Sequence, residues 1–410
     1  MGDKDHLMDV EAFVPSSVAI SGSEEGTLQG HTFAAKDLFS LRGHRSSFGH
    51  ERWRSTHDAA TSTSQILTRM LDAGADLVGL TKLDQLAYSL IGNVGEGAQP
   101  RNTLDDRLFC GGSSSGSAAA VAAGLADIGL GTDTAGSIRV PAAVCGLHSI
   151  RPSHGLIDPD GVIPLAHSFD VVGVFGLQAS IIADVLKVLA PQIPGVTPFT
   201  KVKFAADVFD EADVDTASIG RAVAEAAATI LGVPFNEDEF GSFTSADVGD
   251  LFAQLQGREI WSNHGRWVEE HGSSLAEDVR MRLERCERLS RDPENAKQHD
   301  RTERLTYSRS LNAAVEPGTV VVLPVMLQHG PMRDWDDSQL AEFRSGCFRL
   351  AAPSSLSGAP QAVFSVRRPS DPRSVGVGLL AAPGGDLGLL DLMASLGGDA
   401  QATASDFGWA

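Results

Sequence analysis

Residues 111–142 read GGSSSGSAAAVAAGLADIGLGTDTAGSIRVPA, and two serines in this stretch, Ser113 and Ser137, lie in glycine-rich frames. Bulky side chains are absent from 111–116 and from 135–137, so the backbone at both serines can approach a reacting carbonyl closely. The residues between the two serines predict a small-residue helix, a turn, a strand and a tight loop. One helix and one strand therefore separate two candidate catalytic hydroxyls.

A lysine lies in an apolar run upstream of both serines. The sequence HTFAAKDLF at 31–39 predicts a strand that turns polar at Asp37, and Lys36 stands at its end. Burial disfavours an ammonium ion, and a lysine acts as a base at neutral pH once its pKa falls from about 10.4 to roughly 7–8. This segment alone indicates a structural ion pair between Lys36 and Asp37. Together with the two serine frames, it favours a serine hydrolase that uses lysine as its base for acyl transfer.

Helical and strand-like patterns alternate along the rest of the chain. This alternation predicts an α/β fold with a central mixed, mostly parallel sheet flanked by helices. We divide the chain into a polar leader at 1–28, a core with the catalytic residues at 29–190, a helical cover on the substrate side at 191–315 and a C-terminal completion of the core at 316–410. The division rests on a helix and a strand in 62–83, a strand at 170–176, a helix at 179–190, helices in 258–291 that break near 272–274, a strand at 318–325, and a strand and a helix in 376–396.

The bulk composition excludes several classes of protein. The net charge is −20, and no cluster of lysine and arginine resembles a nucleic-acid footprint. Cys110, Cys145, Cys286 and Cys347 lie too far apart for a zinc site, which indicates reduced structural thiols. No apolar stretch approaches the roughly 18 residues of a membrane span, and residues 1–30 have no secretory signal pattern. We therefore expect a cytoplasmic monomer or homodimer without nucleic-acid or membrane partners.

The segment at 111–142, with TFAAKDLF upstream of it, resembles the amidase signature family of serine hydrolases. The resemblance continues through AGADLVGLTKLDQLAYS at 73–89, PRN at 100–102 and CGLHSIRPSHGLI at 145–157. Within that family, the SFG at 47–49 and the short chain are most similar to the compact indole-3-acetamide hydrolase type. The resemblance implies the amidase signature fold and hydrolysis of the C–N bond of a small amide to a carboxylate and ammonia.

The resemblance also implies a catalytic triad. Ser137 is then the nucleophile, Ser113 a bridging serine on a cis peptide bond, and Lys36 the base that takes the proton through Ser113. No metal or organic cofactor is implied, because Lys36 and the hydroxyls supply the proton transfers. The further residues that it implies are the backbone amides of Thr134, Ala135, Gly136 and Ser137 as an oxyanion hole, and Ser114, Asp133 and Arg139 as supports of that loop.

The expected substrate is an uncharged small amide with an aromatic or apolar acyl group. Tyr88 and Phe175 line its pocket unless they serve core packing. One departure from the family matters, because many members have glycine in place of Ala135, and an alanine at positive φ costs roughly 1 kcal/mol or more. Allophanate hydrolases of the family resemble this chain in carrying alanine there, so a carbamate or urea-derived substrate on the same triad is an alternative.

Three other interpretations stay open. The pattern GxSxG at 112–116 fits a nucleophile elbow in which Ser114 attacks and His148, His154 or His167 is the base. The amidase fold also serves as a catalytically silent binding module in chloroplast import proteins, and as the amidase subunit of tRNA-dependent amidotransferases. The intact triad argues against the binding module, and the compact length argues against the amidotransferase subunit.

Overall fold

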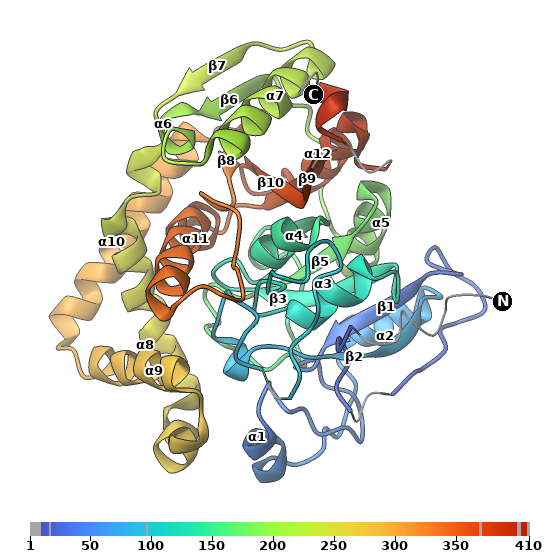
Figure 1. Cartoon of the computed structure of the whole chain (residues 1–410), viewed down its shortest axis with the longest axis vertical. Helices are drawn as coiled ribbons and strands as arrows, with labels where there is room; N and C mark the ends of the chain where they lie inside the picture. The colour runs from blue at the N-terminus through green and yellow to red at the C-terminus, as the bar shows by residue number, and fades with distance from the viewer. Residues whose placement is uncertain (1–9, 16–17, 96, 369–370, 400–402, 408–410) are drawn as a thin grey trace.

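The computed structural model describes residues 10–15, 18–95, 97–368, 371–399 and 403–407. Ten strands in these residues form one sheet, in the order β2-β1-β3-β5-β4-β9-β10-β8-β6-β7 (Figure 1). The strands are β1 Thr32–Lys36, β2 Asp76–Thr81, β3 Ile128–Asp133, β4 His148–Arg151, β5 Val171–Gly176, β6 Lys201–Ala205, β7 Phe235–Asp238, β8 Thr319–Pro324, β9 Gln361–Arg368 and β10 Asp371–Ala381.

The sheet is parallel at its edges and antiparallel in its middle. Strands β2, β1 and β3 pair in parallel at one edge, and β8, β6 and β7 do so at the other. From β3 through β5, β4, β9 and β10 to β8, every pair is antiparallel. The α/β class and the mixed sheet are confirmed, but the prediction of mostly parallel pairing is wrong. Two residues separate β9 from β10 in the sequence, and a parallel pair needs a crossover of a dozen or more.

Helices cover both faces of the sheet. Along β1, Phe33 and Ala35 belong to one apolar cluster and Ala34 to a second, because successive strand side chains point to opposite faces. Helices α2, α5 and α12 contribute to the first cluster, and α3 and α4 to the second. The helices are α1 Glu51–Thr56, α2 Gln65–Asp72, α3 Ser115–Ala122, α4 Arg139–Cys145, α5 Ala179–Leu189, α6 Ala206–Phe209, α7 Val214–Leu231, α8 Ala246–His271, α9 Glu277–Ser290, α10 Glu294–Ala314, α11 Asp337–Ser357 and α12 Asp386–Met393.

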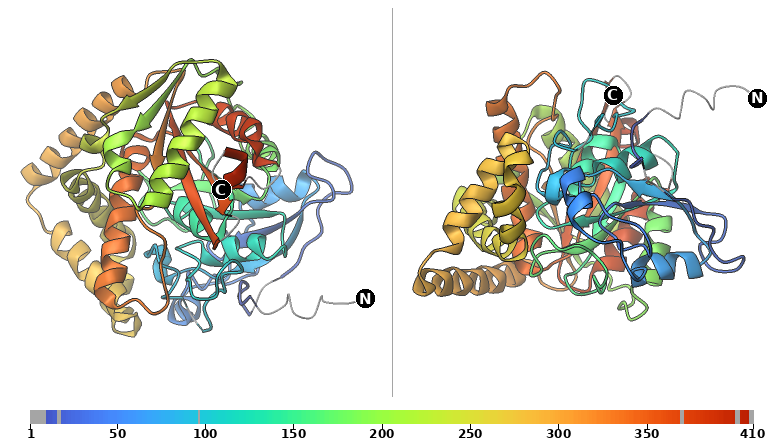
Figure 2. Two further views of the ribbon diagram at one scale, coloured as in Figure 1. Left: turned by 45° about the horizontal axis from the view of Figure 1, so that its top comes forward. Right: turned by 90° about the horizontal axis from the view of Figure 1, so that it is seen from below.

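The range 191–315 is helical only in part. It holds α7 to α10, but it also supplies β6 and β7, which extend the sheet beyond β8. The predicted helical cover therefore did not include the two strands β6 and β7. The five-residue alternation in KVKFA at 201–205 is too short to stand out beside long charged helices. Figures 1 and 2 show α8, α9, α10 and α11 gathered along one side of the molecule, where α8 contacts the other three.

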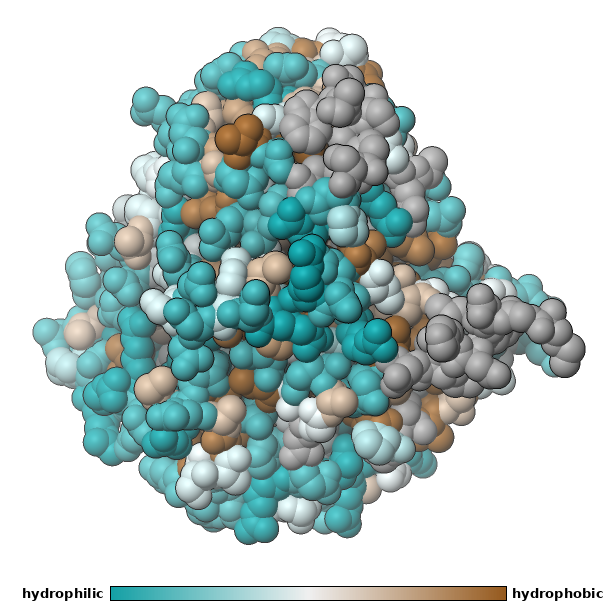
Figure 3. All heavy atoms as spheres, in the orientation of Figure 1, coloured by the Kyte–Doolittle hydropathy of each residue, from teal (hydrophilic) through white to brown (hydrophobic). Residues whose placement is uncertain are grey.

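The described part of the polar leader runs along β2. Phe13 pairs with Thr81 and Ile20 pairs with Leu77 in isolated bridges. Residues 1–9 and 16–17 of the leader lie outside the described residues. On the face shown in Figure 3, polar side chains dominate and apolar ones are scattered. Among the described residues, none of the helices combines the length and the apolar character needed to cross a bilayer.

Candidate active site

Lys36 stands at the carboxyl end of β1, beside the end of β3. The two strands run in parallel, with Ala35 opposite Leu130, so their carboxyl ends meet at one edge of the sheet. Lys36 Nζ donates a hydrogen bond to Thr132 Oγ1 on β3 at 3.0 Å. The lysine side chain is fully buried, so its amine is held away from bulk water.

Ser113 reaches the same amine from the residues that precede α3. Lys36 Nζ and Ser113 Oγ lie 2.8 Å apart, and the Gly112–Ser113 peptide bond is cis. Glycine permits this close packing, since a Cβ on Gly116 would lie 2.6 Å from the carbonyl oxygen of Lys82. Two sequence motifs 77 residues apart therefore meet at one hydrogen bond.

The surroundings of Lys36 favour a neutral amine. Burial lowers the pKa of Lys36 to about 7, and nearby carboxylates, with Asp84 the strongest, partly oppose that shift. Asp84 is itself fully buried, and burial raises its pKa to about 6 although the amides of Gly92 and Val94 donate to it at 3.0 and 3.1 Å. A substantial fraction of Lys36 is therefore unprotonated at neutral pH, as a general base requires.

Asp133 organises the loop that carries Ser137. Its carboxylate accepts hydrogen bonds from the backbone amides of Gly136, Ile138 and Arg139 at 2.8, 3.2 and 3.3 Å. Gly136 has a φ of 114°, in the region that favours glycine. The loop therefore closes around its own aspartate, and Ser137 becomes part of the wall of a cavity.

Two arginines keep Asp133 ionised. Arg139 donates through Nε and Nη2 to the two carboxylate oxygens at 3.0 and 2.8 Å, and Arg151 Nη1 donates to the carbonyl of Asp133 and lies 3.3 Å from Oδ1. Burial favours the neutral acid, but both guanidinium groups outweigh it and hold the pKa of Asp133 well below its usual range. Arg139 also donates to Gln361 Oε1 at 2.6 Å, which ties the loop to β9.

The expected oxyanion hole needs one correction. Thr134, Ala135 and Ser137 line the cavity, but the amide of Gly136 already donates to Asp133 and is not available to an oxyanion. The expected cost of alanine at position 135 does not arise, because Ala135 is not among the residues with positive φ. Thr134 is held in place by a hydrogen bond from its Oγ1 to Asp170 Oδ1 at 2.5 Å.

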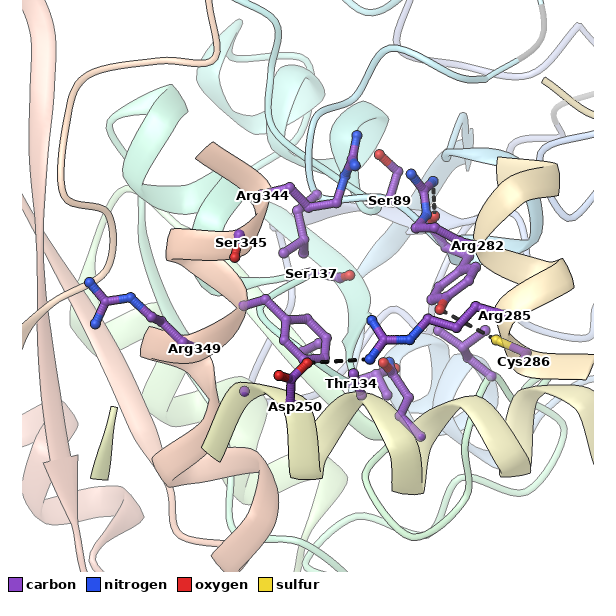
Figure 4. Close-up of a pocket in the computed structure, with 18 of the residues that line it drawn as sticks. Ser89, Thr134, Ser137, Asp250, Arg282, Arg285, Cys286, Arg344, Ser345 and Arg349 are labelled. Atoms are coloured by element: carbon purple, nitrogen blue, oxygen red, sulfur yellow. Dashed lines mark hydrogen bonds and ion pairs between the residues drawn. The ribbon is translucent and has the colours of Figure 1, made fainter. Parts of the chain in front are cut away.

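A cavity of about 440 Å³ opens beside Ser137 (Figure 4). Side chains of α8, α9 and α11 supply most of its wall, and the segments 87–90 and 134–137 complete it. The apolar residues of the lining include Leu90, Leu165, Leu289 and Phe348, and the charged ones are Asp250, Arg282, Arg285, Arg344 and Arg349.

Of the two expected pocket residues, only Tyr88 lines the cavity. Its hydroxyl lies 3.5 Å from Cys286 Sγ, and the cavity residue Ala87 before it takes a φ of 54°, as does its neighbour Leu86 with 53°. Non-glycine residues hold this conformation only where their surroundings determine it, as often occurs at functional sites. Phe175 is fully buried on β5 among the side chains of α3 and α4, so its assignment to the pocket was wrong.

Comparison with known proteins agrees with this geometry. The family model described as Amidase matches residues 11–225, which is more than half of the chain. The chain belongs to the amidase family. It is 32% identical to Amidase 1 of Oryza sativa subsp. japonica over 91% of each chain. It is 30% identical to the Translocon at the outer membrane of chloroplasts 64 of Pisum sativum over 89% of this chain and 65% of that protein.

A solved crystal structure of an amidase has the same fold. It superposes with a TM-score of 0.79 at 24% identity and covers 91% of this chain and 85% of that one. As a member of this family, the protein is an amidohydrolase.

Several residues of the amidase site escaped the sequence analysis. Arg151 and Asp84 lie in stretches identified only for their resemblance, and the one local signal is at Arg151, a charge between Ile150 and Pro152. The cavity arginines of α9 and α11 had no such signal. Arginine recurs throughout 277–291, and only helix packing decides which of these side chains turn toward Ser137.

The nucleophile-elbow alternative finds no base in the amidase fold. Ser114 Oγ donates to the carbonyl of Thr132 at 3.3 Å. His148 is buried on β4, and burial lowers its pKa to about 4. Across the residues that the structure describes, no hydrogen bond joins Ser114 to His148, His154 or His167.

Gly112→Ala is expected to disrupt the amidase site. A Cβ on Gly112 would lie 2.0 Å from Asp84 Oδ2 and 2.9 Å from the amide of Gly92, so the carboxylate next to Lys36 must move. We expect a loss of about 1–3 kcal/mol in the free energy of unfolding and at least a tenfold loss of kcat. Urea unfolding measures the free energy of unfolding, and steady-state kinetics measure kcat. Gly195→Ala is the control, since nothing lies within 4 Å of a Cβ there. Equal stability and activity of Gly112→Ala and the native protein would contradict this packing.

Proposed function

We propose that this amidase hydrolyses a small primary amide through an acyl-enzyme on Ser137. Ser137 Oγ attacks the carbonyl carbon, its proton passes to Ser113 Oγ, and Ser113 passes its own proton to the neutral amine of Lys36. The tetrahedral intermediate then expels ammonia as the proton returns through Ser113. Water attacks the acyl-enzyme by the same relay and releases the carboxylate.

The hydrogen bond between Lys36 and Ser113 carries this proposal. The two atoms lie 2.8 Å apart in a fully buried position, and the pKa of the amine is lowered to about 7. A neutral amine accepts the hydroxyl proton over this contact, and the ammonium returns it once the C–N bond breaks. Ser137 is the serine of the neighbouring loop that lines the cavity, so we assign to it the first proton transfer of the relay, from Ser137 to Ser113.

For the oxyanion we propose the backbone amides of Thr134, Ala135 and Ser137. The amide of Gly136 fastens the loop to Asp133 instead. A loop held by an ionised, buried aspartate does not need to reorganise as negative charge develops on the substrate oxygen. In this proposal Asp133 and Arg139 therefore act by positioning the loop.

The cavity supports a substrate with an apolar part. Tyr88, Leu165, Leu289 and Phe348 supply apolar surface near Ser137, as an aryl or alkyl acyl group of the indole-3-acetamide kind requires. A carbamate or urea-derived amide on the same triad remains the alternative. A catalytically silent binding module has no use for a buried lysine whose pKa is lowered to about 7 and which contacts a serine hydroxyl, so the surroundings of Lys36 support the enzyme.

The test measures both hydrolysis and the acyl-enzyme. The purified protein is given indole-3-acetamide, phenylacetamide, benzamide, butyramide, succinamate, allophanate and an alkyl carbamate at pH 8, and released ammonia is measured. With hydroxylamine present, we expect part of the acyl group to leave as a hydroxamate, because a better nucleophile competes with water. A fluorophosphonate reagent should modify Ser137, as read by peptide mass spectrometry. Ammonia release without hydroxamate, or modification of another serine, would overturn the mechanism.

A further inference from the structure

The cavity beside Ser137 is positively charged in a strongly acidic protein. Its lining contains four arginines, Arg282, Arg285, Arg344 and Arg349, and a single acidic residue, Asp250. The chain as a whole has a net charge of −20. A cluster of positively charged side chains beside Ser137 is therefore not expected from the negative net charge of the chain and needs its own explanation.

Arg282 and Arg344 share one carboxylate. Arg282 Nη1 and Arg344 Nη2 lie 2.9 and 3.4 Å from the same atom, Asp278 Oδ2. Two guanidinium groups thus face one negative charge, and both Nε atoms are buried without an acceptor among the described residues. Burial, with Arg282 next in importance, lowers the pKa of Arg344 to about 10, so it stays protonated at neutral pH. Among the described residues, Asp278 is the one carboxylate within ion-pairing distance of these two guanidinium groups, and Asp84 attracts both from farther away.

The other two arginines of the cavity are compensated. Arg349 pairs with Glu211 and donates to the carbonyl of Thr244 at 2.9 Å. Arg285 lies 3.3 Å from Asp250, and its side chain is half exposed to water, which screens its charge. Arg282 and Arg344 are therefore the cavity arginines that share one ion-pair partner and keep a buried Nε without an acceptor among the described residues.

Arg282 is held rigidly at the edge of the cavity. Its Nη2 donates to the carbonyl of Tyr88 at 2.7 Å, and its guanidinium lies over the Tyr88 ring, 5.3 Å from the centroid. Among the residues that the structure describes, Arg344 on α11 forms one ion pair, with Asp278 at 3.4 Å. Figure 4 shows both side chains on the same side of Ser137. Arg282 is thus a fixed hydrogen-bond donor, and the neighbouring Arg344 has only a longer ionic contact. Two guanidinium groups placed in this way suit the binding of a planar anion such as a carboxylate.

We propose that the acyl group of the substrate carries a carboxylate and that Arg344, supported by Arg282, binds it. This rests on the proposed function, in which the leaving group is ammonia and the acyl group is the part that the cavity holds. The substrate class is then the monoamide of a dicarboxylic acid, and the uncharged amide expected from the sequence is the poorer substrate. The apolar lining packs against the chain between the amide and the carboxylate.

The test compares pairs of amides that differ in a terminal carboxylate. The pairs are succinamate with butyramide, glutaramate with pentanamide, and 4-carboxyphenylacetamide with phenylacetamide. At the chain length that fits, we expect kcat/KM for the anionic member to exceed that of its neutral partner by about tenfold or more. In Arg344→Met this ratio should fall by about tenfold to a hundredfold, chiefly through KM. Arg266→Met is the control for net charge, because its side chain is 94% exposed and absent from the lining; the native ratio is expected there.

A binding measurement separates this inference from the proposed mechanism. The dicarboxylate products, succinate, glutarate and 4-carboxyphenylacetate, are titrated calorimetrically into the native protein and Arg344→Met. Binding of one of them that is lost in Arg344→Met supports the anion site, even if no amide is hydrolysed and the proposed function fails. Preference for the neutral amide in every pair, equal losses for both members in Arg344→Met, or no binding of any dicarboxylate to the native protein would overturn it.

Discussion

Ser137→Ala is expected to lower kcat by about 10⁴-fold or more, because removal of the nucleophile from a covalent mechanism leaves only binding and oxyanion stabilisation. The fold should be unaffected, since the change removes one hydroxyl from the wall of an open cavity. Ammonia release gives the rate, and thermal unfolding gives the stability. Product binding should survive in this variant, which separates loss of chemistry from loss of the site.

Ser114→Ala is the matched control for that result. Ser114 belongs to the GxSxG pattern, but among the described residues its hydroxyl donates to the carbonyl of Thr132 alone, at 3.3 Å. We expect Ser114→Ala to retain at least a tenth of the native rate, because a weak structural hydrogen bond is worth about 1 kcal/mol. Were Ser114→Ala inactive and Ser137→Ala active, the nucleophile-elbow interpretation would replace the one proposed here.

Lys36→Ala is expected to lower kcat/KM at pH 7 by about 10²–10⁴-fold, the usual contribution of a general base. In the native protein the base is the neutral amine, whose pKa is lowered to about 7. Raising the pH through about 7 deprotonates it, so native kcat/KM should rise through that range and level off above it. The variant should lose this rise and gain activity only at high pH, where hydroxide replaces the amine.

The complete pH profiles of kcat/KM decide the outcome. Lys187→Ala serves as the control, because that lysine is exposed and its ion pair is with Asp184, one helical turn away. Its profile should match the native one. If the Lys36→Ala variant kept native activity at pH 7 and the native rise of kcat/KM with pH, Lys36 would not be the base of the relay.

The local sequence was sufficient to select the candidate catalytic residues. Lys36 at the end of TFAAK and the serines in their glycine-rich frames were identified as candidates because the three segments occur together, although each alone fits an ordinary structural role. The structure places Lys36 and Ser113 in hydrogen-bonding contact. The catalytic roles of Lys36, Ser113 and Ser137 stay predictions until the variants are measured.

The α/β class also followed from local patterns, but the pairing of the strands did not. Hydrophobic periodicity depends on neighbours in the sequence, so α2, β2, α3 and β3 were expected close to where they lie. Whether β4, β5, β9 and β10 pair in parallel depends on which strands meet across the sheet. That choice is made by long-range packing, and it gave an antiparallel centre.

What the sequence by itself determined is the choice of the lysine and the serines as candidates, together with the small-residue loops around the serines, because these depend on residue type and on local motifs. Only the tertiary structure decided that the Gly136 amide is occupied by Asp133, that Phe175 is a core residue and that Arg282 and Arg344 meet at Asp278 beside the cavity. Those arginines are 62 positions apart, on helices with many other charges. Their meeting depends on how α9 and α11 pack, which no local pattern of residues specifies.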